Sequence, residues 1–577
     1  MSRRSIPYAN SPLLTQRTPL WRSRFVLALL ALAFVGLIAR AVYVQVLNND
    51  FIQEQGDARM QRTIALEPSR GRILDRNGLI LAASVPAYSL WIDNADPNLP
   101  GWREVAKILG RDLKQLRQTV SQRQGKGFTW MAHQLDEVQG QAIAKLDMPG
   151  VFLNHAYKRA YPEGEAAAHI LGFTNVENNG QEGVELAFNE QLSGHAGSRR
   201  VLKDRLGHII EDVRDIVPPV NGKDVQLSID SKVQFFAYDR IKAAVQKHNA
   251  NSGSVVVLDA QTGEVLALAN YPSYDPNDRS TLRGSSLRNR AITDAFEPGS
   301  TVKPLIVGLA IQEKLIKPST TFNTAPGYMF IGRSRISDSH PHGVLTVSEI
   351  IEKSSNVGTV KISEQLSPQT MWNMYSEVGL GQRPPLPFPG ITRGSLRAYE
   401  SWRPIEKATM SYGYGLSTSL LQLARAYTVF AGDGHLANIS LIKTQSTAPG
   451  PRVFDPAVAK QLRSMLGLVT GDEGTAPRAQ TVGYSVGGKT GTAHKLEGGK
   501  YADKKYRGFF VGLAPIDQPR IIVAVMLDEP KGREYFGGLV AAPVFSETVQ
   551  QTLRILGVTP DMSVQPNIHA QGVEESL

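Results

Sequence analysis

The segment FEPGSTVKP, residues 296–304, places a serine and a lysine at a spacing that suits nucleophilic catalysis. Ser300 follows Pro298-Gly299, and Lys303 lies three residues later. If a helix begins here, the two side chains share a face, and the positive end of the helix dipole favours negative charge on Ser300. Because Pro304 cannot donate a backbone hydrogen bond to the Ser300 carbonyl, we expect Ser300 in the first turn.

Lys303 can take the serine proton only while it is uncharged. A free lysine has a pKa of about 10.4, so burial or a nearby second cation must lower the pKa, and we expect another lysine to converge on this site. The motif alone is weak evidence, because an N-cap serine followed by a surface lysine has the same pattern. A second copy, Ser440-Leu441-Ile442-Lys443, stands without companions in a region that reads as a strand.

Two further motifs supply such companions. In Ser354-Ser355-Asn356, a hydroxyl and an amide two residues apart can face one cleft. Ser354 can pass a proton between Lys303 and a leaving group, and Asn356 can hold the lysine or a substrate amide. The alternative is an ordinary N-cap or turn.

The second companion is GGKTGTA, which contains Lys489-Thr490-Gly491-Thr492. Glycines remove side chains from a strand, so another backbone can approach closely, and an open strand edge can pair with an extended peptide. Lys489 is the expected second cation and can attract the terminal carboxylate of that peptide. The alternative is a glycine-rich edge strand without such a role.

The N-terminus indicates where this chemistry takes place. Residues 1–24 contain five arginines and no acidic residue, and the apolar run at residues 25–47 is long enough to cross a bilayer as a helix. The arginine bias predicts a cytoplasmic N-terminus and an external body. A cleaved signal peptide is the competing interpretation, since Ala39-Arg40-Ala41 resembles a cleavage site.

Composition excludes several classes of function. The chain has 577 residues, which is enough for two or more domains, and 42% of them are hydrophobic. It has no cysteine, which excludes thiol nucleophiles and thiolate metal sites. Half of the net charge of +10 lies in the N-terminal tail, and no zinc-finger or Walker spacing is present, so we expect no nucleic-acid partner.

The sequence also predicts, in outline, the strands and helices that must position these motifs. Residues 68–84 read as a strand, an Asn-Gly turn and a second strand, and VPPVNGKD, residues 217–224, reads as a domain boundary. Two hairpin patterns, at residues 253–270 and 507–530, together with the strand around Lys489, predict a five-stranded antiparallel sheet covered by helices, with helix-rich sequence inserted in its middle. Helices are expected at residues 302–314, 346–364 and 418–431.

The three motifs, in this order, are the set typical of penicillin-binding proteins and class A β-lactamases. With the apolar anchor and the segments RGRILDRNG, YPEGEAAAHILGFTN, SDSHPHG, SYGYGLS and YFGGLVAAPVF, the chain resembles the class B penicillin-binding proteins, most closely the FtsI type, which are division-specific peptidoglycan D,D-transpeptidases. The resemblance extends from Phe25 to about Leu556 and implies an α+β multidomain fold with one N-terminal transmembrane helix.

The resemblance also implies a role for each motif residue. Ser300 is then the acylated nucleophile, Lys303 its base, and Ser354 and Asn356 the proton-relay loop. The backbone N–H groups of Ser300 and Thr492 form the oxyanion hole. The residues implied to bind the substrate or a β-lactam are Ser355, Tyr414, Lys489, Thr490, Gly491 and Thr492. No metal or organic cofactor is implied.

The implied domains are a cytoplasmic tail (1–24), a transmembrane helix (25–47), an elongated β-rich periplasmic pedestal of the dimerisation type (48–222), a transpeptidase domain (223–557) and a flexible tail (558–577). The expected ligands are stem peptides of lipid II-derived strands and β-lactam antibiotics. The expected partners are a glycosyltransferase of the FtsW type and other division proteins in the inner membrane at the septum.

Other interpretations stay open. A D,D-carboxypeptidase or β-lactamase would share Ser300 and Lys303, although no deacylating Glu-x-x-x-Asn element is found where a class A β-lactamase would need it. The others are an elongation-specific transpeptidase, a non-catalytic scaffold, and a β-lactam sensor, which 24 cytoplasmic residues would not suit. Secondary expectations concern three further groups: a cleft-bordering loop rather than a metal site at Asp338, His340 and His342; cleft-lining or packing aromatics at Tyr412, Tyr535 and Phe536; and structural ion pairs at Arg70 and Arg72.

Overall fold

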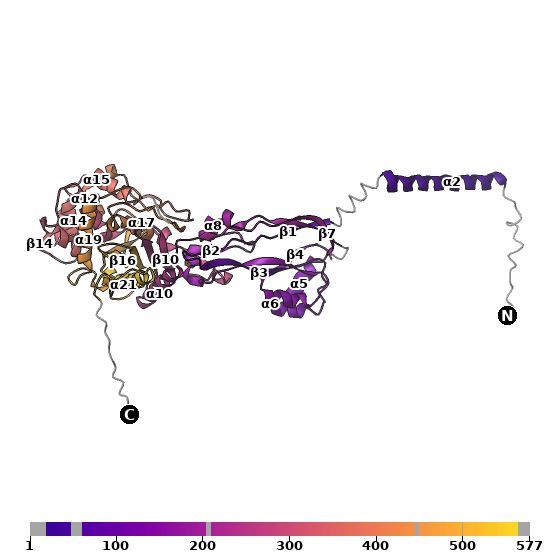
Figure 1. Cartoon of the computed structure of the whole chain (residues 1–577), viewed down its shortest axis with the longest axis horizontal. Coiled ribbons are helices and arrows are strands. Elements are labelled where there is room, and N and C mark those ends of the chain that lie inside the picture. Colours follow the sequence, from indigo (N-terminus) through magenta and orange to yellow (C-terminus); the bar gives the residue numbers. More distant parts are fainter. Residues whose placement is uncertain (1–18, 48–60, 204–208, 445–448, 499, 564–577) are drawn as a thin grey trace, which may run out of the picture.

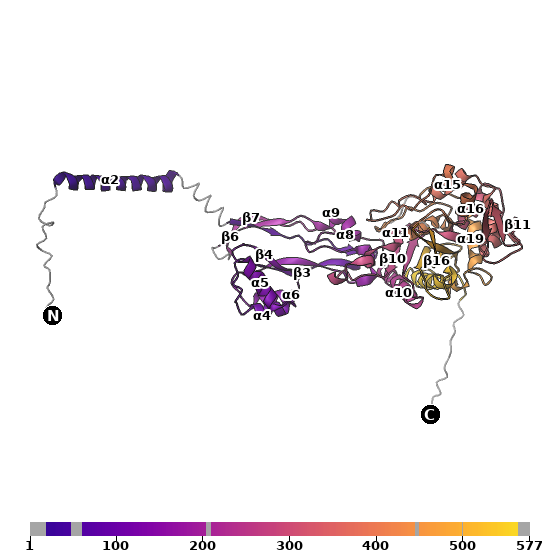
Figure 2. The same ribbon diagram turned by 180° about the vertical axis from the view of Figure 1, so that it is seen from behind.

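The computed structural model describes residues 19–47, 61–203, 209–444, 449–498 and 500–563, and the molecule is elongated (Figures 1 and 2). Helix α2 (Leu20–Val42) and the π-helical turn Tyr43–Leu47 stand at the N-terminal end. Residues Leu20–Gln45 are long and apolar enough to cross a membrane, with a mean hydropathy of 2.5, so the apolar helix begins five residues before the predicted Phe25. Most of both predicted tails lies outside the described residues.

The pedestal, which follows this helix in the chain, is built from two sheets. In one, β6 (Gly197–Lys203) lies between β1 (Gln61–Leu66) and β7 (Ile209–Val217), and all pairs are antiparallel. In the other, the long strand β3 (Ile80–Ile92) pairs with β2 (Ile73–Leu74), β4 (Thr129–Leu135) and β5 (Val151–Ala160). Helices α4 (Trp102–Ile108), α5 (Leu113–Arg123) and α6 (Glu137–Ala144) enclose a separate small core around the fully buried Trp102.

Short helices complete the base of the pedestal, and a buried ion network holds them. These helices are α7 (Ala168–Leu171), α8 (Gly183–Ala187) and α9 (Asn189–Ser193). The carboxylate of Glu185 accepts from Arg70 Nε at 2.6 Å and from Arg159 Nε at 2.7 Å, and all three side chains are at most 2% exposed. Arg72 pairs with Asp224 at the surface. Both predicted structural arginines therefore form ion pairs.

The predicted strand, Asn-Gly turn and strand at residues 68–84 is confirmed as β2 and β3, and it attaches the pedestal to the catalytic domain. Asp75 Oδ2 accepts hydrogen bonds from both the backbone nitrogen and the hydroxyl of Ser231, at the start of α10 (Ser231–Lys247). Arg76 pairs with Glu264. Strand β8 (Val225–Gln226), which follows the predicted boundary, runs parallel to β2 and still belongs to the pedestal sheet.

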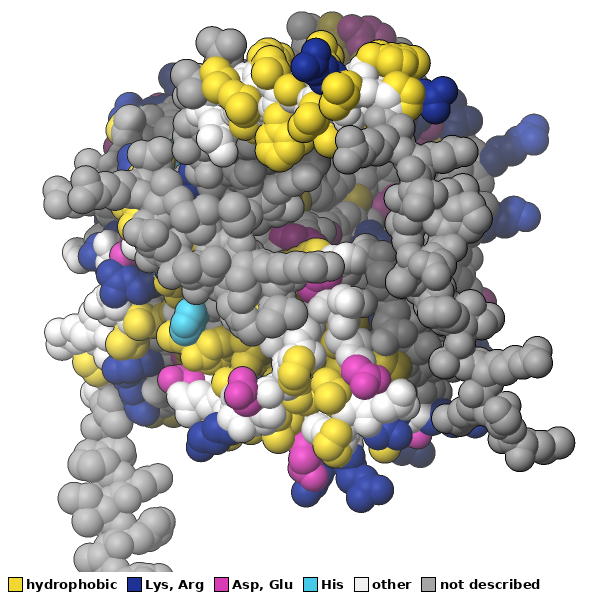
Figure 3. Space-filling view, turned by 90° about the vertical axis from the view of Figure 1, so that its right-hand side faces the viewer, with side chains coloured by type: hydrophobic (Ala, Val, Ile, Leu, Met, Phe, Trp, Pro, Cys, Tyr) yellow, Lys and Arg dark blue, Asp and Glu magenta, His cyan; other side chains and the backbone are white. Residues whose placement is uncertain are grey.

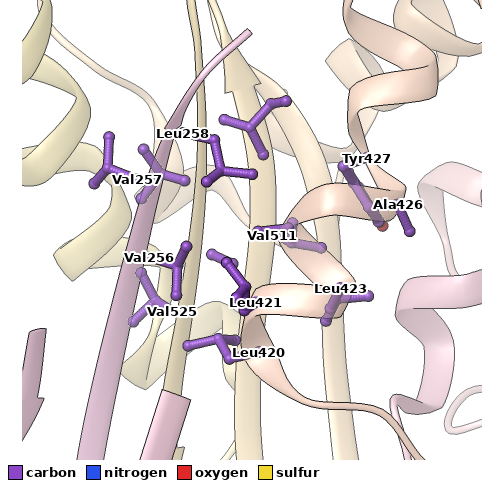
Figure 4. Packing of buried hydrophobic residues seen from close by; sticks show 14 of the residues in the cluster. Val256, Val257, Leu258, Leu420, Leu421, Leu423, Ala426, Tyr427, Val511 and Val525 are labelled. Carbon is purple, nitrogen blue, oxygen red and sulfur yellow. The ribbon is translucent and has the colours of Figure 1, made fainter. Parts of the chain in front are cut away.

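The catalytic domain contains the predicted five-stranded antiparallel sheet, in the order β10-β9-β17-β16-β15. Its strands are β9 (Ser252–Asp259), β10 (Val265–Tyr271), β15 (Gly487–Glu497), β16 (Lys500–Ala514) and β17 (Ile521–Asp528). Helices α10 and α21 (Ala542–Ile555) cover one face, and α17 (Leu420–Ala426) covers the other. Leu420 and Leu421 of α17 lie on the side of the helix that faces Val256 and Val525 of the sheet, in a fully buried core (Figure 4).

Helix-rich sequence between β10 and β15 forms the rest of the domain. It contains α11 (Arg290–Thr293), α12 (Lys303–Gln312), α13 (Val347–Glu352), α14 (Asn356–Ser363), α15 (Pro368–Glu377), α16 (Pro404–Ser411), α18 (Thr428–Ala431) and α19 (Pro456–Thr470), with α20 (Gly537–Val540) after β17. Two small hairpins are added, β11 (Thr321–Asn323) with β14 (Val344–Thr346) and β12 (Tyr328–Ile331) with β13 (Ser334–Ser337). Short 3-10 helices lie at Gly164–Ala166, Arg279–Thr281, Gly284–Leu287, Gly299–Val302, Tyr399–Ser401 and Pro477–Ala479.

Three details differ from the sequence-based expectations. The helix predicted at residues 346–364 is two helices, α13 and α14, because Ser354 between them has a φ of 63°. The helix predicted at 418–431 is likewise divided into α17 and α18. The second Ser-x-x-Lys copy does not lie in a regular strand; Ser440 and Ile442 form only isolated bridges, to Glu264 and Leu227.

Candidate active site

The sequence FEPGSTVKP forms a tight turn that leads into α12. Gly299–Val302 is a 3-10 helix, and α12 continues from Lys303, so Ser300 lies in the first turn as Pro304 requires. Gly299 has a φ of 54° and donates its N–H to the carbonyl oxygen of Gly413 at 3.1 Å. From behind, the buried Tyr427 hydroxyl donates to the Thr301 carbonyl at 2.6 Å. The backbone around Ser300 is therefore fixed on two sides.

Lys303 is fully buried, and its ammonium contacts the second motif. Lys303 Nζ donates to the backbone carbonyl of Ser354 at 2.5 Å and to the Ser354 hydroxyl at 3.2 Å. Burial lowers the pKa of Lys303 to about 7, against the opposing pull of the Asp338 carboxylate. A lysine with this pKa is partly deprotonated at neutral pH, which a general base for Ser300 needs.

The Ser354 loop is held in an unusual conformation. Ser354 has a left-handed backbone, which is uncommon for a residue with a side chain and is found disproportionately at functional sites. The hydroxyl of the buried Ser355 caps α14 by accepting from Gly358 N at 2.9 Å and donates to Asp338 at 2.7 Å. Ser355 therefore caps α14, and its expected contact with a ligand stays a prediction. Asn356 Nδ2 donates to the Ser337 carbonyl at 2.8 Å.

Asp338 organises this loop, a role that the sequence analysis did not find. Besides Ser355 Oγ, its carboxylate accepts from the backbone nitrogens of Asn356 at 2.5 Å and Val357 at 2.9 Å, at the N-terminus of α14. The side chain was noted only as part of an apparent metal cluster with His340 and His342. Among the described residues, no group of three or more His, Asp or Glu side chains is placed to hold a metal ion.

The third motif lies on β15, at the edge of the sheet, against the Ser300 turn. A Cβ atom added to Gly491 would lie 2.9 Å from the Thr301 methyl group and 3.0 Å from the Pro298 carbonyl oxygen. Only glycine therefore permits this close approach of strand and turn, as expected from the sequence. The three motifs, which are distant in sequence, meet in one region.

Lys489 is the expected second lysine, and it is also fully buried. Its Nζ lies 3.2 Å from the Thr490 hydroxyl and 3.4 Å from the Thr490 carbonyl oxygen. Burial lowers the pKa of Lys489 well below its usual range, and the positive charge of Lys303 lowers it further. Of the two causes expected to lower the pKa of Lys303, burial or a second cation, burial is the one that acts there.

The threonines of this motif connect the strand to its neighbours. The Thr490 and Thr475 hydroxyls are 3.0 Å apart. The Thr492 hydroxyl accepts from Gly537 N at 3.1 Å, which ties the segment YFGGLVAAPVF to the strand. Only glycine fits at Gly537, since an added Cβ would lie 2.5 Å from the Gly491 carbonyl oxygen.

Aromatic side chains continue from this strand on both sides. Tyr414 makes edge-to-face contacts with Tyr412 and with Tyr501 of β16, with ring centroids 5.8 and 5.9 Å apart. Tyr535 stacks between Tyr506 and Phe536, at 4.3 and 4.4 Å. These rings therefore pack on one another, as one of the two expectations had it, and the cleft-lining role stays a prediction. Tyr501 and Tyr506 were not singled out from the sequence.

Comparison with known proteins agrees with this architecture. The family model for the penicillin-binding protein transpeptidase domain matches residues 253–550, and the model for the penicillin-binding protein dimerisation domain matches residues 65–227. The chain is 42% identical over 545 residues to the probable peptidoglycan D,D-transpeptidase PenA of Neisseria meningitidis, covering 93% of each chain. It is 37% identical to the peptidoglycan D,D-transpeptidase FtsI of Escherichia coli K12, covering 94% of this chain and 93% of that one.

A solved structure gives the same assignment for the catalytic domain. The transpeptidase domain of penicillin-binding protein 3 from Burkholderia pseudomallei is 50% identical, with a TM-score of 0.54, and the match covers 58% of this chain and 98% of that one. The described helices and sheets, the three meeting motifs and these relatives lead to one assignment. The chain belongs to the class B penicillin-binding protein family and has the dimerisation and transpeptidase domains of a serine-type peptidoglycan D,D-transpeptidase.

Proposed function

We propose that this protein cross-links stem peptides of septal peptidoglycan through an acyl-enzyme on Ser300. The observation that carries the mechanism is the position of Lys303, which is buried, has a pKa of about 7 and contacts both the backbone and the hydroxyl of Ser354. The uncharged lysine accepts the proton of Ser300 as its oxygen attacks the D-Ala-D-Ala bond, and Ser354 relays a proton to the departing D-alanine.

Other residues hold the substrate and stabilise the charge that develops. Lys489, Thr490 and Thr492 on β15 bind the carboxylate of the donor peptide or of a β-lactam, and the open edge of β15 pairs with the extended peptide. The N–H groups of Ser300 and Thr492 face the developing oxyanion. Asn356, anchored by Asp338 and Ser337, borders the same cleft. An amine from a neighbouring stem peptide then displaces Ser300.

The cellular setting is part of the proposal. The N-terminal apolar helix anchors the chain once in the inner membrane with the N-terminus in the cytoplasm, so the pedestal and catalytic domain are periplasmic. Seen from the N-terminal end, hydrophobic side chains are visible in the upper part of the view, on the side where Figure 1 places α2, and in the lower part (Figure 3). Phe128 and Trp130, which are 51% and 42% exposed, are exposed aromatic residues of the pedestal. Exposed aromatic residues of this kind suit contacts with division partners, including a glycosyltransferase of the FtsW type.

Intact-mass measurement of the full-length protein with benzylpenicillin tests the chemistry. We expect one penicilloyl adduct that maps to the peptide with Ser300, persists for many minutes and does not form in Ser300→Ala. A label on another residue would refute the assignment, and rapid turnover of the drug would instead favour a β-lactamase or carboxypeptidase.

The septal role has a separate test, because an elongation-specific enzyme would share the chemistry. The relative named FtsI favours the division type. We expect a fluorescent fusion at the septum and no rescue of division by Ser300→Ala. Localisation along the side wall would support the elongation-specific alternative, and rescue by Ser300→Ala would support a scaffold.

A further inference from the structure

Glu297 is an acidic residue three positions before the proposed nucleophile, and nothing in the mechanism above uses it. Its Oε1 atom accepts a hydrogen bond from the backbone nitrogen of Gly415 at 2.8 Å and another from the Tyr501 hydroxyl at 3.3 Å. The carboxylate therefore connects three elements beside the cleft: the Ser300 turn, the loop SYGYG (residues 411–415), and strand β16.

The second carboxylate oxygen has no such partner. Oε2 of Glu297 is shielded from solvent and accepts no hydrogen bond from any residue in the parts of the chain that the structure describes. Burial raises the pKa of Glu297, although the hydrogen bonds from Gly415 and Tyr501 oppose this effect. A shielded carboxylate oxygen without a partner is costly, so its presence needs an explanation.

The acylation step does not explain why a shielded carboxylate lies at position 297. Negative charge near Ser300 opposes the formation of the oxyanion, and it repels the donor carboxylate that Lys489 attracts. The second half of the reaction has the opposite requirement, because the attacking amine is an ammonium ion in neutral solution. A carboxylate is the natural partner of an ammonium group, and aromatic rings attract the same charge. Tyr414 and Tyr501 supply rings that contact each other beside Glu297.

We propose that Glu297, with Tyr414 and Tyr501, forms the binding site for the ammonium group of the acceptor peptide. The inference rests on the proposed transpeptidase function and adds the acceptor side of the cleft to it. The incoming ammonium donates to Oε2, the carboxylate oxygen that has no hydrogen-bond partner among the described residues, so the charge of Glu297 is neutralised when the acceptor arrives.

Each proton of the acceptor nitrogen has a destination in this arrangement. The ammonium loses one proton to the Glu297 carboxylate, which passes it to water. The resulting amine attacks the acyl carbon, a new C–N bond forms, and the ester bond to Ser300 Oγ breaks. The second proton of the nitrogen goes through Lys303 to Ser300 Oγ and restores the hydroxyl. The raised pKa of Glu297 makes its carboxylate a better proton acceptor than an exposed glutamate.

The test measures how the acyl-enzyme divides between aminolysis and hydrolysis. Full-length protein is acylated with an N-acetylated peptide thioester ending in D-alanyl-thioglycolate, and the amide and acid products are separated by mass spectrometry. The charged acceptor is D-alanine amide, and the uncharged one is hydroxylamine, which is mostly neutral at the assay pH. The variant is Glu297→Gln, whose side-chain oxygen still accepts from Gly415 and Tyr501. The matched control is Glu377→Gln, an exposed residue on α15.

In Glu297→Gln we expect the aminolysis-to-hydrolysis ratio with D-alanine amide to fall about tenfold or more, as for the loss of one charge-assisted hydrogen bond. With hydroxylamine the ratio should change by less than about threefold, and the Glu377→Gln control should match the parent protein with both acceptors. An equal loss with both acceptors would show a purely structural role and overturn the proposal, as would no loss with either. Failure of the parent protein to form any acyl-enzyme would instead overturn the proposed function itself.

Discussion

Lys303 Nζ lies 2.5 Å from the carbonyl oxygen of Ser354 and 3.2 Å from its hydroxyl. The lysine thus donates to a residue whose backbone is left-handed and whose loop is fixed by Asp338. This contact joins the first two motifs.

Acylation should depend on the protonation of Lys303. Because burial lowers its pKa to about 7, the lysine is mostly charged below that pH and mostly neutral above it. The rate of acylation by benzylpenicillin should rise with pH and level off above about 7, with about a tenfold loss for each pH unit below. Stopped-flow measurements with a fluorescent penicillin check this, and a flat profile through neutral pH would exclude Lys303 as the titrating base.

The Asp338→Asn variant should move that profile. The Asp338 carboxylate raises the pKa of Lys303, so its removal lowers the pKa and shifts the rising limb toward lower pH. The plateau should also fall, because Ser355 and Asn356 lose a charged acceptor that holds their loop. The same stopped-flow profile reports both effects. A lower plateau with an unmoved limb would show that Asp338 acts on loop geometry alone.

Replacing Lys303 by methionine should abolish acylation and raise stability. Between about pH 7 and the unfolded lysine value of 10.5, the unfolded chain binds a proton that the folded chain does not. The lysine therefore lowers stability most at the acidic end of this window, and stability rises with pH through it. At neutral pH, Lys303→Met should raise the free energy of unfolding by about 1 kcal/mol or more, and so raise the unfolding temperature. The variant should also lose the part of the pH dependence of stability that Lys303 causes. Calorimetry on the full chain tests this, and a lower unfolding temperature would contradict it.

The close approach of Gly413 to the Ser300 turn should be essential. An added Cβ at Gly413 would lie 2.1 Å from the Gly299 carbonyl oxygen, and Gly413 has a φ of 89°. Gly413→Ala should push the turn away from its loop and slow acylation at least about tenfold. The matched control is Gly467→Ala inside α19, where the nearest atom would be 3.9 Å away. Equal acylation rates in the two variants would refute this role of Gly413.

The pedestal should depend on one buried carboxylate. Glu185 is the shared partner of Arg70 and Arg159, so Glu185→Ala leaves two buried guanidinium groups without it. We expect a loss of about 3–5 kcal/mol in pedestal stability, measured by denaturant unfolding of the full chain. Arg72→Ala, which breaks the exposed pair with Asp224, should leave the unfolding midpoint nearly unchanged. Equal effects of the two variants would show that burial does not determine how much these ion pairs contribute to the free energy of unfolding.

The sequence predicted the sheet well because its strands have strong local patterns. The two hairpins around β9–β10 and β16–β17, and the glycine-rich β15, were each recognisable alone. The division of the helix at 346–364 was not, because Ser354 is left-handed and the residues after it are held by Asp338, which comes from another segment. The motif residues Ser300, Lys303 and Lys489 were identified, whereas Asp338, Tyr427 and Tyr501 act through contacts that no local spacing reveals.

The attachment of β2 and β3 to the start of α10 has a mechanical consequence. Asp75 accepts a hydrogen bond from Ser231, and Arg76 forms an ion pair with Glu264. The apolar residues of this segment belong to the same hydrophobic core as the interior of the catalytic domain. A force applied along the pedestal is therefore transmitted to the whole catalytic domain, because the connection between the two domains is rigid at that point. The length of the pedestal strands then sets the distance between the Ser300 turn and the N-terminal end of the pedestal.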